Sequence, residues 1–460
     1  PPAVRPIDNA KTSRLNATAC PLDKVWLPWL DVILATLQWL LGCHARPALG
    51  KFDQVDAYKK WPSRPRDQWA AHLLTVDDTG RPAAFINSAL NFGALGSVWG
   101  YCWFSTAWAI SLSWALGIIV LAYVDDFATI TPASTSLAPI VALHHAFGLA
   151  VHETPGKIHH PERGAPCPLL GVRITVDTTR VVSANEPDRI AKLVTVCDTL
   201  ATTATVPLAA FRTLIGKLCF AAAQTWGRSA RAGLRALFRH ARKDPVPVTD
   251  LLQVWLRYFA LLLPTAPPRV LTVSEARLRC TLWVDGAWRA DVGTIGAVLR
   301  TPVGVFCWGG TVPQAVADSW RAVGQTHLVY PAELYAVWVS LETFASLIRG
   351  CALLIFEDNE AARHSLTSGA TKNAAAALLV HYVWQEFHKL NILPWIARVP
   401  SSSNPADAPS RLQFNQGRAL GWTKVPARLP DCSVLPTNAP ALAAQLETTL
   451  SAMRAVRRTA

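Results

Sequence analysis

A long stretch without charge is the feature that most restricts how this chain can fold. No Asp, Glu, Lys or Arg occurs from Pro82 to Val124, and two adjacent carboxylates, Asp125 and Asp126, follow directly. Residues 106–124 are long enough to span a membrane as a helix. Gly117 interrupts them, however, "IIVLAYV" is typical of a buried strand, and no Lys or Arg anchor follows. We therefore expect a helix, a break and a strand, with a membrane-anchored protein as the alternative.

The two adjacent carboxylates raise an electrostatic question of their own. Like charges at Asp125 and Asp126 repel each other wherever water is partly excluded, so the pair needs open water or a bound cation. An exposed turn would supply the water. Other motifs in the sequence are needed to distinguish an exposed turn from a cation-binding site.

Composition and charge limit the architecture and the partner. The chain has 460 residues, of which 51% are apolar and 16% charged, so we expect two or three folded domains. The net charge of +13 indicates a polyanionic partner, and nucleic acid is favoured over an anionic membrane surface.

Cysteines and histidines give no support for a zinc or disulfide framework. Ten cysteines are present without any Cys-x-x-Cys pair, which favours a reducing compartment. The pairs His144–His145 and His159–His160 are expected at the surface or in loops. No signal peptide is recognised, so we expect a cytoplasmic or nuclear location, and the late position of the only methionine, Met453, suggests a piece of a longer polyprotein.

Pattern changes along the chain suggest six segments. Residues 1–50 form a partial subdomain whose apolar helix, "VWLPWLDVILATLQWLLG", is expected to end at Gly50, and residues 51–180 alternate strands with helices. A mainly helical segment and a proline-rich linker come next, followed by a second strand-rich unit and a tail: residues 181–265, 266–276, 277–412 and 413–460.

Three motifs in the first half resemble the palm of a reverse transcriptase. They are "KFDQVDAYKKW", "ALNFGALGSVWG" and "YVDD" at Tyr123–Asp126. The resemblance implies that Asp53, Asp125 and Asp126 are catalytic and hold two divalent ions, and that Tyr58 excludes a ribose 2′-hydroxyl. Ligand sets made of oxygen favour Mg²⁺ or Mn²⁺, which would also answer the question of charge repulsion.

The same resemblance implies further contacts with substrate. Phe92 and Gly93 would lie beside the incoming nucleotide, although Asn91 and Val98 depart from the family pattern. Lys157 would protonate the leaving pyrophosphate, or be an ordinary surface lysine. Two others complete the set: Gly171 in a hairpin that grips the primer, and Arg5 as a triphosphate contact in a truncated fingers segment. An ordinary strand remains the alternative around Gly171.

An arginine series follows in the helical segment. The stretch "LIGKLCFAAAQTWGRSARAGLRALFRH" is similar to the thumb and connection region of gypsy-like and especially DIRS-like retroelements. Its arginines recur at steps of three or four, so one helix would align them on a face that contacts phosphates or is simply solvated. They are Arg228, Arg231, Arg235, Arg239 and Arg242.

A second set of acids occurs at the ends of expected elements. Asp285 lies among adjacent strands whose glycines suit hairpin turns, and Glu333 is expected in the first turn of a helix opened by Pro331. Asp358 ends a buried strand, and Asp407 lies near a helix start after a serine loop. Taken singly, these acids could be helix caps or dipole partners.

The order and spacing of the four acids resemble ribonuclease H. Asp285, Glu333, Asp358 and Asp407 are separated by 48, 25 and 49 residues, and the ending Asn404–Arg411 strengthens the likeness to retroelements. The resemblance implies that all four are catalytic and hold two Mg²⁺ or Mn²⁺ ions. No histidine shortly precedes Asp407, so a product-release histidine is not carried over.

Together these features predict an α+β palm of the right-hand polymerase type with a helical thumb, followed by an α/β ribonuclease H-like domain. The expected function is RNA-directed DNA synthesis with cleavage of RNA in RNA/DNA hybrids. The expected partners are an RNA template, a DNA primer, their hybrid and deoxynucleoside triphosphates, without a membrane. The alternative is an inactive, truncated retroelement remnant that binds nucleic acid without polymerising.

Overall fold

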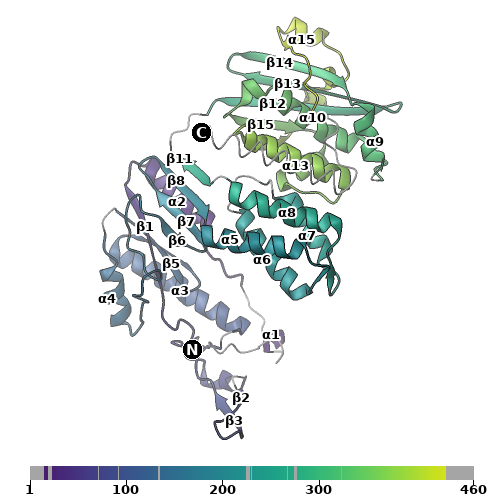
Figure 1. Ribbon diagram of the computed structural model, residues 1–460. Helices are drawn as coiled ribbons and strands as arrows, with labels where there is room; N and C mark the ends of the chain where they lie inside the picture. The colour runs from purple at the N-terminus through teal and green to yellow at the C-terminus, as the bar shows by residue number, and fades with distance from the viewer. Residues whose placement is uncertain are drawn as a thin grey trace. The chain divides into compact units, whose positions relative to one another are not determined.

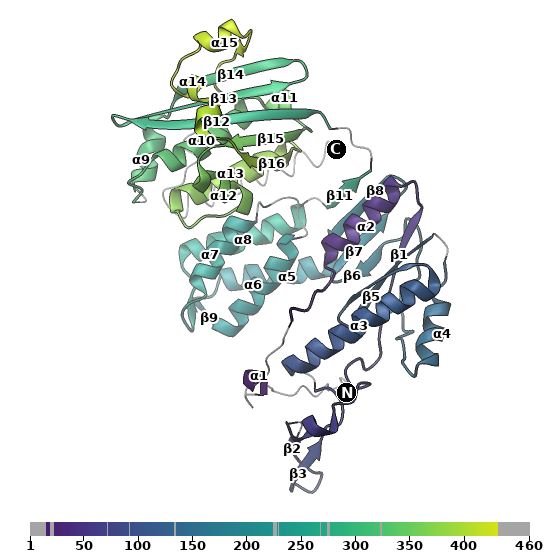
Figure 2. The ribbon, with the colours of Figure 1, turned by 180° about the vertical axis from the view of Figure 1, so that it is seen from behind.

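The computed structural model divides the chain into two compact units (Figures 1 and 2). The first comprises Pro1–Glu186 and Arg269–Ser274, and the second Pro187–Pro268 and Glu275–Ala460. The structure describes residues 15–18, 23–70, 72–91, 93–132, 135–223, 228, 230–266, 268–273, 277–322 and 324–430. Arg5, Phe92 and most of the expected tail, residues 431–460, lie outside the described residues.

The first unit is built on small antiparallel sheets. A three-stranded sheet has the order β1-β5-β4, and a four-stranded sheet has the order β11-β8-β7-β6. A separate hairpin pairs β2 with β3. The strands are β1 (Pro47–Asp53), β2 (His72–Val76), β3 (Pro82–Ile86), β4 (Ile119–Tyr123), β5 (Asp126–Pro132), β6 (Cys167–Leu169), β7 (Val172–Val176), β8 (Arg180–Asn185) and β11 (Arg269–Thr272).

Residues 106–124 form the end of a helix, a break and a strand, as predicted. The helices of this unit are α1 (Leu15–Thr18), α2 (Leu30–Gly42), η1 (Pro65–Ala70), α3 (Leu95–Leu116) and α4 (Ala138–Ala146). Gly117 ends α3 with φ of 64°, a left-handed conformation that glycine adopts without strain, and β4 begins at Ile119. Among the described residues, no helix combines the length and the apolar character needed to cross a membrane.

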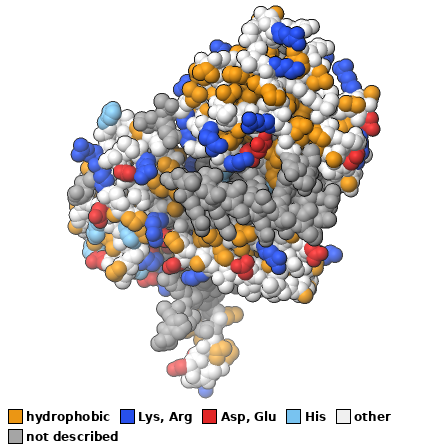
Figure 3. All heavy atoms as spheres, turned by 45° about the horizontal axis from the view of Figure 1, so that its top comes forward, with side chains coloured by type: hydrophobic (Ala, Val, Ile, Leu, Met, Phe, Trp, Pro, Cys, Tyr) orange, Lys and Arg blue, Asp and Glu red, His pale blue; other side chains and the backbone are white. Residues whose placement is uncertain are grey.

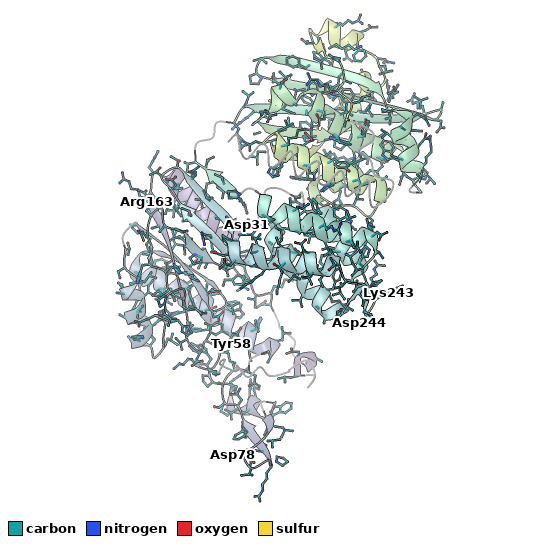
Figure 4. All side chains as sticks on the ribbon, in the orientation of Figure 1. Asp31, Tyr58, Asp78, Arg163, Lys243 and Asp244 are labelled. Atoms are coloured by element: carbon teal, nitrogen blue, oxygen red, sulfur yellow. The ribbon has the colours of Figure 1, made fainter. Side chains whose placement is uncertain are left out.

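Three sequence expectations for this unit were wrong in detail. Helix α2 ends at Gly42, and Gly50 lies within β1, so the boundary drawn at residue 50 cuts a strand. His144 is fully buried in α4, where its Nε2 accepts a hydrogen bond from Trp108 Nε1 at 2.8 Å. The expected linker contains β11, which pairs with β8 and is tied to α2 by an ion pair between Arg269 and Asp31 (labelled in Figure 4).

Four helices open the second unit and pack around a core of their own. They are α5 (Pro187–Ala201), α6 (Leu208–Ala223), α7 (Arg231–His240) and α8 (Asp250–Thr265), with a small pair of strands, β9 (Thr205–Val206) and β10 (Val246–Pro247). The ring of Tyr258 in α8 lies 5.4 Å from that of His381, edge to face. Leu378 also packs against the core of these helices, and residues 187–268 belong to the same compact unit as the strand-rich segment that follows.

The rest of the second unit is a mixed six-stranded sheet with helices. The strand order is β16-β15-β12-β13-β14-β17, in which β12, β13 and β14 are antiparallel neighbours while β15 runs parallel to both β12 and β16. The strands are β12 (Arg279–Arg289), β13 (Val292–Thr301), β14 (Gly304–Thr311), β15 (Ala352–Glu357), β16 (Leu393–Arg398) and β17 (Thr423–Lys424).

A central helix, α10 (Val329–Thr343), packs against this sheet. It contacts β12, β13 and α13 and is buried on nearly all sides, as its almost continuous apolar sequence requires. The other helices are α9 (Gln314–Ala322), α11 (Ala345–Ile348), α12 (Glu360–Ser368), α13 (Ala374–Lys389), η2 (Ser401–Ser403), α14 (Asp407–Ser410) and α15 (Asn415–Ala419).

Candidate functional site

Three acids of the second set meet at one edge of the mixed sheet. Asp285 lies in β12, and Asp358 follows β15, the parallel neighbour whose Phe356 pairs with Trp283. Glu333 approaches from α10, and ligand oxygens of the three side chains lie within 4.8 Å of one another. Because neighbouring parallel strands end at the same edge, sequence positions far apart supply one site.

A glycine permits the close contact between strand and helix. A Cβ atom on Gly286 would lie 2.9 Å from the backbone nitrogen of Glu333, closer than real Cβ contacts. The expectation that such glycines form hairpin turns was wrong here, since Ala290 and Asp291 make the turn with φ of 45° and 65°. Glu333 also lies in the second turn of its helix, because α10 begins two residues before Pro331.

The glycine contact gives a first prediction. We expect Gly286→Ala to lower the free energy of unfolding by roughly 1–3 kcal/mol, because the added methyl group must push α10 away from β12. Chemical denaturation measures this directly. Gly310→Ala is the matched control, since a Cβ on Gly310 meets nothing within 4 Å. Equal stability of the two variants would contradict the proposed contact.

Burial and mutual repulsion raise the pKa values of these acids. Burial raises the pKa of Asp285 to about 6, with Asp358 and Asp407 adding to the rise and a hydrogen bond donated by Ser410 opposing it. The pKa of Glu333 is raised well above its usual value, first by burial and then by neighbouring carboxylates. A group of ionised acids is therefore unfavourable here without a counter-charge.

Sequence reasoning missed a fourth acid of this cluster, Glu357. It occupies a core-facing position of β15 and is 0% exposed, and it interacts electrostatically with Glu333. Burial raises the pKa of Glu357 well above its usual value. Within the described residues, neither Glu333 Oε2 nor Glu357 Oε2 has a hydrogen-bond partner. The alternation along "ALLIFE" could have shown that this glutamate faces inward.

Asp407 is placed differently from the other predicted acids. It begins α14, as expected, but lies outside the group of close ligand oxygens and forms an ion pair with Arg411 at 2.6 Å. Helix α14 lies directly on the sheet, since a Cβ on Gly296 would be 2.4 Å from the backbone nitrogen of Ser410. This contact explains how Ser410 reaches Asp285.

The donor set fits a hard divalent cation. All three close ligands are carboxylates, which Mg²⁺ and Mn²⁺ prefer, and a cation would relieve the repulsion that raises the pKa of Asp285. The Oε2 atom of Glu333 is buried without a protein partner among the described residues, as a ligand oxygen would be. The three acids can therefore hold a divalent cation together.

The raised pKa of Asp285 gives a second prediction, on stability. Its folded-state pKa of about 6 lies above the usual 3.8, so the free energy of unfolding falls as pH rises through this window, by roughly 3 kcal/mol from this group. Asp285→Asn lacks this ionisable group and should not lose that stability. Without divalent ions, we therefore expect its free energy of unfolding to rise by about that amount, relative to the unaltered protein, between pH 4 and pH 7.5. Denaturation at both pH values measures the change. The exposed control Asp198→Asn should show no such gain, and a gain of similar size there would contradict the assignment.

The acids of the first set occur at paired strand ends. Asp53 ends β1, Asp126 begins β5, and the two are register partners, while Asp125 lies in the β4–β5 turn beside Val124, whose φ is 57°. Burial raises the pKa of Asp126, and Asp125 and Asp53 raise it further. The expected strand turn is confirmed, and the pair is half-buried, so open water alone does not surround it.

A lysine occupies part of this first site. Lys157 Nζ forms an ion pair with Asp53, and the hydrogen bond to that carboxylate is the main cause that raises the pKa of Lys157. Among the described residues, no group of three ligand side chains within 4.8 Å includes Asp53, Asp125 or Asp126. Asp53, Asp125 and Asp126 therefore lie near one another, but their ligand oxygens do not form a group as close as that of the second set.

Tyr58, which is labelled in Figure 4, interacts electrostatically with Asp125 of this first site. Its ring stacks on Tyr101 at 4.8 Å, and burial followed by the charges of Cys102 and Asp125 raises the pKa of Tyr58 to about 12. The phenol therefore stays neutral at physiological pH.

Gly93 precedes α3 with φ of 91°, and Gly171 has φ of 75° in the β6–β7 turn, which confirms the expected hairpin.

The arginine series is only partly helical. Arg231, Arg235 and Arg239 belong to α7, while Arg228 and Arg242 lie in the turns before and after it. Burial lowers the pKa of Arg228, whose side chain lies against Gly369. Figure 3 shows Lys and Arg side chains beside hydrophobic ones on one face of the molecule.

Comparison with known proteins does not identify a family. No protein-family model matches the chain, and no curated protein matches it significantly.

Proposed function

We propose that the chain is a metal-dependent ribonuclease acting on RNA/DNA hybrids, joined to an RNA-directed DNA polymerase of retroelement type. The observation that carries the proposal is the convergence of Asp285, Glu333 and Asp358, whose ligand oxygens lie within 4.8 Å. Their order along the chain is the one expected of ribonuclease H, and the Asn404–Arg411 ending resembles that of retroelements. A net charge of +13 favours binding to a polyanion.

Each side chain near the carboxylate site has a specific role in the proposed cleavage of RNA. Asp285, Glu333 and Asp358 would hold Mg²⁺ or Mn²⁺, which when bound activates water and stabilises charge on the phosphate. Ser410 orients Asp285 by donating a hydrogen bond to its Oδ2. Asp407 completes the predicted set at the edge of the site, where Arg411 positions its carboxylate.

The polymerase role rests on the first set. Asp53 and Asp126 face each other across paired strands, and Asp125 is next to them in the turn. A bulky buried ring, Tyr58, follows the same strand and would exclude a ribose 2′-hydroxyl from the nucleotide. Lys157 is near enough to these acids to serve as the proton donor for pyrophosphate once Asp53 binds a metal ion.

A specific observation favours a second candidate, a nucleic-acid-binding remnant without polymerase activity. The ion pair between Lys157 and Asp53 already neutralises one predicted ligand, and the first set forms no closed ligand group among the described residues. Such a remnant would bind RNA/DNA hybrid with steep salt dependence and show no metal-dependent turnover.

A paired assay on the purified chain with Mg²⁺ tests the proposal. One reaction follows primer extension on an RNA template, and the other follows cleavage of labelled RNA in an RNA/DNA hybrid. Both activities support the full proposal, and cleavage alone supports only its nuclease half. Hybrid binding without either activity would contradict the proposal and favour the remnant.

A further inference from the structure

A basic pocket lies in the second unit, away from the carboxylate cluster. It has a volume of about 830 Å³ and is lined on one side by α7 and on the other by the segment between α12 and α13. Arg239 Nη2 donates a hydrogen bond to the backbone oxygen of Lys372 at 2.6 Å, which fixes the two sides relative to each other. Lys243 and Asp244, labelled in Figure 4, follow α7 shortly after the pocket residue Arg242.

The charge of this pocket has one sign. Its lining includes Arg231, Arg235, Arg239, Arg242 and Lys372, and no acid is among the described lining residues. Within the described part of the chain, none of these side chains forms an ion pair with a carboxylate. Like charges gathered in a concave site raise the local concentration of anions. Guanidinium groups bind phosphate through paired, charge-assisted hydrogen bonds, and a phosphate offers enough oxygens for several of them.

An aromatic side chain lies among these cations. Phe238 lines the pocket and is 54% exposed, so its ring is accessible to a ligand. Arg231, Arg235 and Phe238 are spaced four and three residues apart, so they share one face of α7. Exposed rings beside cations are typical of sites where nucleic-acid bases stack.

We infer that this pocket binds an unpaired nucleotide within a nucleic-acid strand, with its phosphate held by the arginines and Lys372 and its base stacked on Phe238. In a duplex the bases are stacked within the helix and cannot enter a concave pocket, so a single strand is the form that fits. The inference rests on the proposed function only for the choice of nucleic acid as ligand. The pocket is built from other residues than the carboxylate cluster and needs no metal.

Fluorescence anisotropy with a labelled 12-nucleotide single strand tests the inference on the full chain, in EDTA so that no cleavage occurs. We expect Phe238→Leu to weaken binding about tenfold, since base stacking on a ring is lost. We expect Arg235→Gln to reduce the slope of log affinity against log salt by about 0.7, the value for one phosphate contact on a single strand. Arg212→Gln, an exposed arginine of α6 that does not line the pocket, is the control and should change neither quantity.

Two further arms separate this ligand from others. Binding of a blunt RNA/DNA hybrid should be unchanged by Phe238→Leu, and an unlabelled deoxynucleoside triphosphate should not displace the strand at comparable phosphate concentration. Unchanged single-strand affinity in both pocket variants would overturn the inference, as would an equal loss for the hybrid or efficient displacement by the free nucleotide. Because these measurements omit divalent ions, loss of the proposed catalytic activities would leave them unaffected.

Discussion

Asp358→Asn is expected to abolish cleavage of RNA in an RNA/DNA hybrid while primer extension by the same protein continues. Asp358 supplies one of three carboxylates whose oxygens lie within 4.8 Å, so the change removes a charged metal ligand from the site. Metal ions contribute several kcal/mol to such reactions, and we expect the rate to fall by roughly a thousandfold or more, which corresponds to about 4 kcal/mol. Single-turnover cleavage of labelled RNA at saturating Mg²⁺ measures the loss.

The control for this prediction is an exposed acid in the same unit. Asp318 on α9 pairs with Arg321 at 2.8 Å on the surface, so Asp318→Asn should cleave at the rate of the unaltered protein. Equal loss of cleavage and extension in Asp358→Asn would contradict the separation of the two sites. Thermal unfolding of both variants shows whether a loss of activity reflects a loss of folded protein.

Asp125→Asn is expected to have the opposite pattern, with primer extension abolished and cleavage retained. Asp125 lies in the turn between β4 and β5, next to Asp126 and to the end of the strand that carries Asp53. If these carboxylates hold the catalytic ions, removing one charge should again reduce the rate by roughly a thousandfold. Extension of a labelled primer on an RNA template measures this effect.

An acid on the hairpin of the same unit controls for the change of charge. Asp78 is exposed in the β2–β3 turn (Figure 4), so Asp78→Asn should extend primers normally. If the unaltered protein does not extend primers although it cleaves hybrid, the ion pair between Lys157 and Asp53 is the feature to change next. Lys157→Gln would then release Asp53 and should permit metal binding there.

Sequence patterns predicted most elements because local signals and burial agreed. The β-branched residues after Gly117 form β4, and the acidic pair lies at the turn between β4 and β5. The alternating residues around Asp285 form β12 and β13. Each of these signals depends on neighbours along the chain, which a sequence displays directly.

Features set by tertiary contacts were not predictable in the same way. The glycines around Asp285 suit hairpin turns by sequence, whereas Gly286 lies in a strand and allows Glu333 to approach the sheet. Glu357 became part of the site because β15 lies beside β12, and Lys157 became the partner of Asp53 across a sequence separation of 104 residues. Arg228 and Arg242 continue the spacing of α7, but the helix begins after Arg228 and ends before Arg242.

Binding of Mn²⁺ tests most directly whether the carboxylate cluster is a metal site. A calorimetric titration at pH 7.5, above the pKa of about 6 for Asp285, compares the unaltered protein with Asp358→Asn and Asp318→Asn. We expect the unaltered protein and Asp318→Asn to bind Mn²⁺, and Asp358→Asn to bind it at least tenfold more weakly. Identical binding by all three proteins, or none by any, would contradict this expectation.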